Sequence, residues 1–453
     1  MLQTGASSVL KSPGRRAPLA APRLRRDQHG SVSVIFSVCV TVILGVVGLG
    51  TEGAMWYLQH QHGQNVADAA AESGAFALAN DQEASVSSAA VAAASGIPEN
   101  ALTVTTGVST GVGNFTPGGT PANAVRAAVT QSFQPTLSGL FLTGPISISE
   151  SAVALIIPAT STPCVLALAT NAAEGVRLDG NAQVTCNGGG VASNTTSATS
   201  LGMNGNTSIT ATTVTTAGGC SGCTGHLSLT DPLQTYQPPT PDPFAAAQAV
   251  SLPTFSGSGC RPMPSLKGTV NLPPSTTQAF CTGQDLSITG NSVVNLSPGV
   301  YFFYGANISV AGSGSLLCPS CGNGQGVTLI LTGPNNGAGA GTVSISGNTT
   351  VDLSAAASNA WNPAFNGILF YLDARSSNAV QISGGADMTL GGGLYFPSSS
   401  VAFSGGAAGA SEDTCSVLVA ATVTFNGNGN FGTNNCESLD MPTGSGQSVK
   451  LVQ

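Results

Sequence analysis

Twenty consecutive residues without a charge, from Ser31 to Gly50, most constrain what this chain can fold into. At a rise of about 1.5 Å per residue, a helix of this length spans a bilayer core of about 30 Å. A cleaved signal peptide is the rival interpretation, but its apolar core is normally about 7–15 residues long and is followed by a small-x-small site. The run here is longer, and the sequence beyond it continues as helix. We therefore expect an uncleaved transmembrane anchor over residues 31–50.

Charge is distributed unevenly about this run. Six of the twelve basic residues lie in residues 1–30, a basic segment that holds one acid, Asp27. The rest of the chain carries six basic and nineteen acidic side chains, a formal charge of −13. The positive-inside rule places the basic segment in the cytoplasm and the remainder outside. This predicts a single-pass protein of the inner (cytoplasmic) membrane with its body in the periplasm or beyond, and the acidic body argues against nucleic acid as a partner.

The helix is expected to continue to about residue 79. Trp56 and Tyr57 follow the apolar run, where aromatic rings favour the headgroup interface. Small side chains such as Val66 and Ala70 come next, and they suit close packing against either another helix or the chain's own domain. A small α+β domain is expected within residues 51–160. Its remaining elements are a short helix at 81–98 and strands at 101–106, 123–133 and 145–157.

Past Pro163 a degenerate motif recurs, in which alternating apolar and polar residues flank a turn of Gly or Asn. Charged residues make up 7% of the chain, against about 25% in ordinary domains, so hydroxyl and amide groups cover its surface. A single repeat of this kind cannot bury its apolar face, whereas stacked repeats can. We expect residues 164–440 to form a right-handed parallel β-helix or solenoid, with a β-sandwich as the alternative. The eight copies begin at Val176, Leu201, Leu286, Ile308, Val343, Val380, Val401 and Val423.

Two other segments have a distinct composition. The Pro-rich stretch Gln237–Pro243 interrupts the repeats and is typical of an extended surface linker. The tail, residues 441–453, is expected to be frayed.

The eleven cysteines divide into one in the apolar run, Cys39, and ten beyond it. An even number outside the membrane fits an oxidising compartment. Sequence does not fix the connectivity, and pairing of neighbours is the simplest hypothesis. Two pairs are CxxC motifs that zinc or redox chemistry also uses, but both lie in Gly/Ser-rich loops, which favours structural disulfides. The hypothesis pairs Cys164 with Cys186, Cys220 with Cys223, Cys260 with Cys281, Cys318 with Cys321, and Cys415 with Cys436.

Catalytic signatures are weak. A β-helix lyase or glycosidase would cluster acids and bases on one strand face, and here the candidates are scattered. Asp373 and Arg375 share a face two residues apart, an arrangement that favours a salt bridge over a catalytic pair. No catalytic residue, metal ligand or cofactor is predicted, and we expect the protein not to be an enzyme.

The N-terminal stretch from Arg25 to Ala79 resembles the TadG-like family of Tad/Flp pilus assembly. It has that family's basic run and Gly, apolar helix, acidic-aromatic turn (Glu52, Trp56 and Tyr57) and ADAAA element. Three C-terminal stretches look like the Gly-rich region often joined to this anchor: residues 295–303, 367–406 and 415–436. Related pseudopilins carry Glu five residues after their cleavage-site Gly, where this chain has Ile35 after Gly30, a departure that favours an uncleaved anchor.

The resemblance implies a structural or accessory role in assembling or anchoring Flp-type pili, and hence in adhesion. It implies the lipid bilayer and other Tad pilus-assembly proteins as partners. A periplasmic or surface β-helix protein that binds or modifies carbohydrate, such as a cell-wall polysaccharide, is the alternative function.

Overall fold

The computed structural model describes residues 29–140, 143–158, 163–384, 387–405, 415–433 and 447–452. The chain divides into two compact units, which are considered separately below. The first comprises residues 1–63 and 131–149, and the second comprises residues 64–130 and 150–453.

The first unit combines a helix with the connection between two strands. Helix α1 (His29–Ala79) begins in this unit and runs on into the second. The connection joins strand β3 (Ala124–Phe133) to strand β4 (Ile146–Pro158) and contains the short 3₁₀ helix η2 (Ser138–Leu140). The expected apolar N-terminal helix is therefore confirmed.

A five-stranded sheet forms the first part of the second unit, in the order β2-β1-β3-β4-β28. The end of α1 and helix α2 (Ala84–Ala94) bury a small-residue core with this sheet, in which Val66 and Ala70 are almost fully enclosed. The small side chains of α1 thus pack against the chain's own domain. The remaining elements are η1 (Glu99–Ala101), β1 (Leu102–Ser109), β2 (Phe115–Pro117) and β28 (Gln447–Leu451).

Strand β28 shows how the two β regions of the chain are connected. It pairs antiparallel with β4, with Leu451 opposite Ala154 and Gln447 opposite Pro158. The chain therefore leaves the small sheet after β4 and continues through residues 163–433. It then returns to the same sheet as β28, which pairs with β4. The expectation of a frayed tail is wrong for residues 447–451, because backbone pairing holds them in the sheet.

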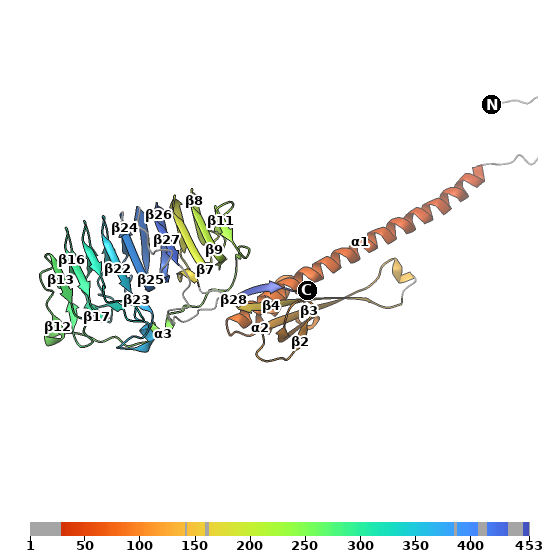
Figure 1. Ribbon diagram of the computed structural model, residues 1–453. Coiled ribbons are helices and arrows are strands. Elements are labelled where there is room, and N and C mark those ends of the chain that lie inside the picture. The colour runs from red at the N-terminus through yellow and green to blue at the C-terminus, as the bar shows by residue number, and fades with distance from the viewer. Residues whose placement is uncertain are drawn as a thin grey trace, which may run out of the picture. The chain divides into compact units, whose positions relative to one another are not determined.

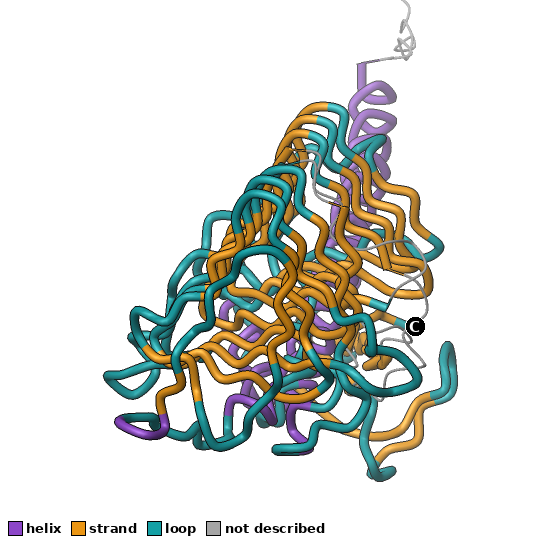
Figure 2. Tube along the Cα trace, turned by 60° about the vertical axis from the view of Figure 1, so that its left-hand side comes forward, coloured by secondary structure: helices purple, strands orange, loops and turns teal. Residues whose placement is uncertain are grey.

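Residues 163–433, called the parallel region below, form a large sheet whose described pairings are all parallel. The antiparallel sandwich considered above is thus not the arrangement observed. From β13 to β22 each strand pairs with the strand three positions further along, so each three-strand passage of the chain stacks on the next in three ladders. Elsewhere spacings of two or one occur, as in β5–β7 and β25–β26. Figure 2 shows strands over strands and turns over turns. Long strands bend from one ladder into the next.

The strands are grouped here by ladder. Ladder 1 contains β13 (Thr269–Leu272), β16 (Val293–Leu296), β19 (Ser315–Leu317), β22 (Thr350–Ser354), β25 (Asp387–Gly405), β27 (Asn430–Thr433), β7 (Gln183–Ser193), β9 (Ser208–Thr216) and β11 (Leu227–Leu229). Ladder 2 contains β12 (Cys260–Arg261), β14 (Ala279–Cys281), β17 (Gly299–Tyr304), β20 (Val327–Thr332), β23 (Ile368–Leu372), β26 (Ser416–Gly427) and β5 (Pro163–Ala167), with parts of β25, β7 and β9. Ladder 3 contains β15 (Leu286–Ile288), β18 (Ile308–Val310), β21 (Val343–Ile345), β24 (Val380–Ser383), β6 (Val176–Gly180), β8 (Leu201–Gly205) and β10 (Cys220–Ser221), with parts of β25 and β26.

A stack of glycines explains the recurring motif. Each turn between ladder 3 and ladder 1 holds a Gly at positive φ, a conformation that costs other residues about 1–2 kcal/mol. These glycines also lie on one another: a Cβ added to Gly347 would be 2.8 Å from the carbonyl oxygen of Gly312. The stack contains Gly290, Gly312, Gly347, Gly384, Gly405, Gly427, Gly180 and Gly205.

The three-strand passages are stacked in an order that differs from their order in the sequence. The chain enters at β5, in the middle of the stack, winds outward to β11, and resumes at β12 at the opposite end. It then winds back until β26 pairs with β5 and β6, and β27 pairs with β7. In Figure 1 the blue strands of the C-terminal part accordingly lie beside the yellow strands of residues 176–205. The first and last passages meet at this internal seam.

The segment between β11 and β12, residues 235–259, covers the outer side of ladder 2. It contains α3 (Ala245–Gln248) and η3 (Gly257–Gly259), and with η4 (Pro363–Phe365) it encloses a second apolar core. Phe244 is 2% exposed and packs edge-on against Tyr395, with ring centroids 5.3 Å apart. The Pro-rich stretch was expected to be an extended surface linker. Pro239 and Pro241 are indeed exposed, but Pro238, Thr240 and Pro243 are buried, so the stretch packs on the fold instead of forming a free linker.

Candidate functional site

The apolar part of α1 has its side chains exposed. Val32, Phe36 and Leu44 are each more than 60% exposed, although the sequence around them has no charge. A helix in the core of a soluble domain would bury such side chains. Within the described part of the chain, α1 is the helix long and apolar enough to cross a membrane. Cys39 lies in this run, and it is the free thiol among the described cysteines.

Glu52, the first charge beyond the apolar run, is held by the β3–β4 connection. Its side chain is 5% exposed. The backbone N–H of Thr136 donates to Oε1 over 2.9 Å and that of Ser138 donates to Oε2 over 2.8 Å. The Ser138 hydroxyl also donates to Oε1, over 2.8 Å. The carboxylate is thus desolvated but fully engaged, which is the condition under which a buried charge is tolerated. Sequence analysis identified Glu52 but not this partner, which lies more than eighty residues along the chain.

The cysteines of the parallel region lie close in four of the five hypothesised pairs. Their Cα atoms are 5.9 Å apart for Cys164–Cys186, 6.1 Å for Cys220–Cys223, 5.4 Å for Cys260–Cys281 and 5.3 Å for Cys318–Cys321. These distances are in the disulfide range. Cys436 lies outside the described residues, so the fifth pair stays a prediction.

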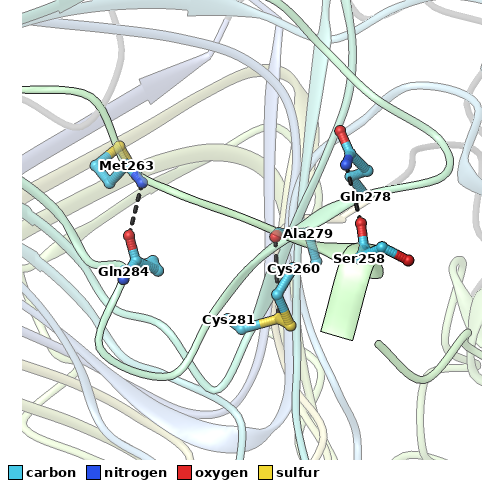
Figure 3. The surroundings of a disulfide bond; sticks show 7 residues. All are labelled: Ser258, Cys260, Met263, Gln278, Ala279, Cys281 and Gln284. Carbon is cyan, nitrogen blue, oxygen red and sulfur yellow. Dashed lines mark hydrogen bonds between the residues drawn. A yellow bond between two sulfur atoms is a disulfide. The ribbon is translucent and has the colours of Figure 1, made fainter. Parts of the chain in front are cut away.

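One of these bonds closes an end of the stack. The Cys260–Cys281 bond joins β12 to β14, as Figure 3 shows. Around it the backbone N–H of Met263 donates to Gln284 over 2.7 Å, and the Gln278 amide donates to the Ser258 carbonyl over 3.0 Å.

Beside this bond Arg261 lies over the ring of Phe280, 4.0 Å from its centroid. A guanidinium over an aromatic face is attracted by the ring quadrupole. Burial lowers the pKa of Arg261. The Arg261 guanidinium therefore covers the aromatic ring of Phe280 at this end of the core.

Asp373 and Arg375 form the predicted salt bridge, in the turn after β23. Asp373 is 1% exposed and accepts hydrogen bonds from Arg375 Nε over 2.7 Å and from the Thr332 hydroxyl over 2.7 Å. The Asp373 carboxylate raises the pKa of Arg375. Both side chains are therefore engaged within the fold.

The described residues contain no group of three or more His, Cys, Asp or Glu side chains that could hold a metal ion.

A second ion pair lies on β6 beside the seam. Arg177 bridges Asp179 and Glu174, and Asn204 of the neighbouring passage donates to Asp179 over 3.1 Å. The hydrogen bond from Arg177 lowers the pKa of Asp179.

A comparison with known families gives one match. The family model described as Putative Flp pilus-assembly TadE/G-like matches residues 30–96. This range includes the apolar run, Glu52 and α2, and it corresponds to the N-terminal anchor region of a TadG-like protein. No curated protein and no solved structure matches the chain.

Proposed function

We propose, on the premise that residues 30–96 are a TadE/G-like Flp pilus-assembly region, that this protein is a membrane-anchored structural or accessory component of a Flp pilus-assembly system. The observation that carries the proposal is the form of α1. One continuous helix has an exposed apolar first part and a second part buried in the small domain, so it fastens the rest of the chain to a bilayer.

The membrane in this proposal is the inner, cytoplasmic one. The basic residues before the run keep residues 1–30 in the cytoplasm. The small domain and the parallel region are then exported, and the oxidising exterior accounts for the closely placed cysteine pairs.

The parallel region acts as a rigid exported body. We assign it as a right-handed β-solenoid, because parallel strands joined within one sheet almost always cross over with that hand. Its insertion between β4 and β28 fastens both its ends to the anchored domain. Such a body suits contact with other pilus-assembly proteins and support of adhesion.

No enzymatic activity, cofactor or nucleic-acid binding is part of this proposal. The acids that could serve catalysis are scattered, and Asp373 is committed to Arg375 and Thr332. The acidic body repels nucleic acid. Assaying the purified exported body on peptidoglycan and acidic polysaccharides tests the alternative: turnover abolished by Asp373→Asn would show an enzyme, and binding without turnover would show a wall-binding module.

The direct test is deletion of the gene, followed by counting surface pili and attached cells. We expect both counts to fall and a plasmid-borne wild-type copy to restore them. A matched copy whose residues 1–50 are replaced by a cleavable signal peptide should fail to restore them, because the body is then released from the membrane. Unchanged pilation and attachment after deletion would contradict the proposal.

A further inference from the structure

The β3–β4 connection reaches the apolar run of α1. Leu137 packs directly against Gly48: a Cβ added to that glycine would lie 2.8 Å from Leu137 Cδ1 and 3.0 Å from Cδ2. Glu52, one helical turn further along, accepts three hydrogen bonds from Thr136 and Ser138. Contacts on two successive turns hold this connection against the helix.

The position of Gly48 along α1 sets the depth in the bilayer at which Leu137 contacts the helix. Gly48 lies inside the uncharged run, which ends at Gly50. The aromatic residues Trp56 and Tyr57 lie about 12 Å further out, from eight residues at about 1.5 Å each. If residues 31–50 occupy the hydrocarbon core, a side chain that touches Gly48 lies at the boundary between hydrocarbon and headgroups, inside the aromatic belt.

The composition of the connection suits that depth. The stretch Gln131–Ser149 contains no Asp, Glu, Lys or Arg. Leu137 remains 37% exposed after packing on the helix, so part of its apolar surface has no protein partner. The one carboxylate nearby, Glu52, accepts three hydrogen bonds and can therefore enter a region of low dielectric at reduced cost.

We propose that the β3–β4 connection is a second membrane contact, seated in the lipid interface at the outer end of the anchor, with Leu137 against lipid and Glu52 as the fastening group. This inference rests on the proposed membrane anchoring. One helix leaves a body free to tilt and rotate about its point of exit. A second contact at the same depth fixes the orientation of the connection relative to the bilayer.

Depth-dependent fluorescence quenching tests the contact in the full chain reconstituted into phosphatidylcholine vesicles. The two native indoles are removed as Trp56→Phe and Trp361→Phe, and Leu137→Trp supplies the probe. We expect the indole at position 137 to be quenched most by lipid brominated near the glycerol end of the acyl chain. Tyr236→Trp in the same background is the matched control, since this exposed aromatic lies in the parallel region and should not be quenched.

The fastening role of Glu52 is tested in the Leu137→Trp chain. Glu52→Ala removes both carboxylate oxygens, and with them all three hydrogen bonds. It should reduce the quenching towards the level of the Tyr236→Trp control, while the protein stays in the membrane on alkaline carbonate extraction. Glu72→Ala, an equivalent change later in α1, should leave the quenching unchanged.

Three outcomes would contradict the inference. Quenching at position 137 no greater than at position 236, in protein that resists carbonate extraction, would overturn the lipid contact and leave the anchor intact. The same low quenching would be seen if a second copy of this protein, and not lipid, covered Leu137. Unchanged quenching in Glu52→Ala would overturn the fastening role, and extraction of the wild-type protein by carbonate would overturn both the inference and the proposed anchoring.

Discussion

Gly347 lies within the stack of positive-φ glycines, with its own φ at +86° and Gly312 beside it in the neighbouring passage. We expect Gly347→Ala to lower the free energy of unfolding by about 3 kcal/mol, from the cost of the left-handed conformation and from crowding in a packed region. Denaturant unfolding measures the change.

A second glycine, Gly268, separates the cost of the left-handed conformation from the cost of crowding. Its φ is +69°, yet a Cβ there would meet nothing within 4 Å. Gly268→Ala should therefore cost only the conformational part, about 1 kcal/mol. Equal losses in the two variants would show that the stacking contact at Gly347 contributes nothing.

Asp179 gives a prediction about pH. Its pKa is lowered by the hydrogen bond from Arg177, so its ionised form is favoured by folding. Its contribution to stability is present above the pKa of the unfolded chain and is lost as the pH falls through the lowered, folded-state pKa. The contribution should be small because the pair is partly exposed.

Carboxyl NMR titration measures this pKa directly. The midpoint for Asp179 should lie below the ordinary range for Asp, and Arg177→Met should raise it. A midpoint that does not respond to Arg177→Met would exclude the ion pair as the cause.

At the scale of elements, the segment that covers ladder 2 depends on one close fit. A Cβ added to Gly393 would lie 2.6 Å from Phe244 Cζ, and the Tyr395 hydroxyl donates to Asp242 over 2.6 Å on the same segment. Gly393→Ala should therefore displace Phe244 and destabilise the protein by about 1–3 kcal/mol. Limited proteolysis should then cut within residues 235–259.

A double-mutant cycle tests whether the two positions act through this contact. Phe244→Leu shortens the side chain, so it should cost less in the Gly393→Ala background than in the wild type. Strictly additive costs would show that the segment is held elsewhere.

The elements themselves were largely predictable from sequence, and the covering segment was not. Strands β1, β3 and β4 lie within a few residues of their expected bounds, because alternating patterns identify them well. Strand β17 has a near-continuous apolar run, VYFF, which is the sequence signal that a second layer covers its outer face, and β20 is likewise buried on both faces although Thr328 and Thr332 lie on one of them. The Pro-rich composition of Gln237–Pro243 suggested an exposed linker. Composition does not decide this, because prolines are as compatible with a docked extended segment as with a linker.

At the scale of the whole molecule, the repeats indicated stacking but not the order of stacking. Each degenerate copy fits several neighbours equally well, so nothing in the sequence shows that β26 meets β5, or that β28 returns to β4. The partner of Glu52 was missed for a similar reason, because backbone N–H groups donate to it and any sequence carries those.

The proposed export of the body predicts the redox state of the cysteines. Thiol labelling of the denatured, unreduced protein should find one reactive cysteine, Cys39. Removing a bond that closes a loop of about 20 residues, as Cys164→Ser with Cys186→Ser does, should cost about 3 kcal/mol in the chain-entropy model. Several reactive thiols with bound zinc would show instead that the CxxC pairs are metal ligands.

The three lysines of the chain test its topology most directly. Lys11 precedes the apolar run, whereas Lys267 and Lys450 follow it, and both of these side chains are exposed. A membrane-impermeant amine reagent applied to spheroplasts, with peptide mass spectrometry as the readout, should modify Lys267 and Lys450 and spare Lys11. All three should react after the membrane is permeabilised. Modification of Lys11 in intact spheroplasts, or protection of Lys267 and Lys450 there, would contradict a single-pass anchor that holds an exported body.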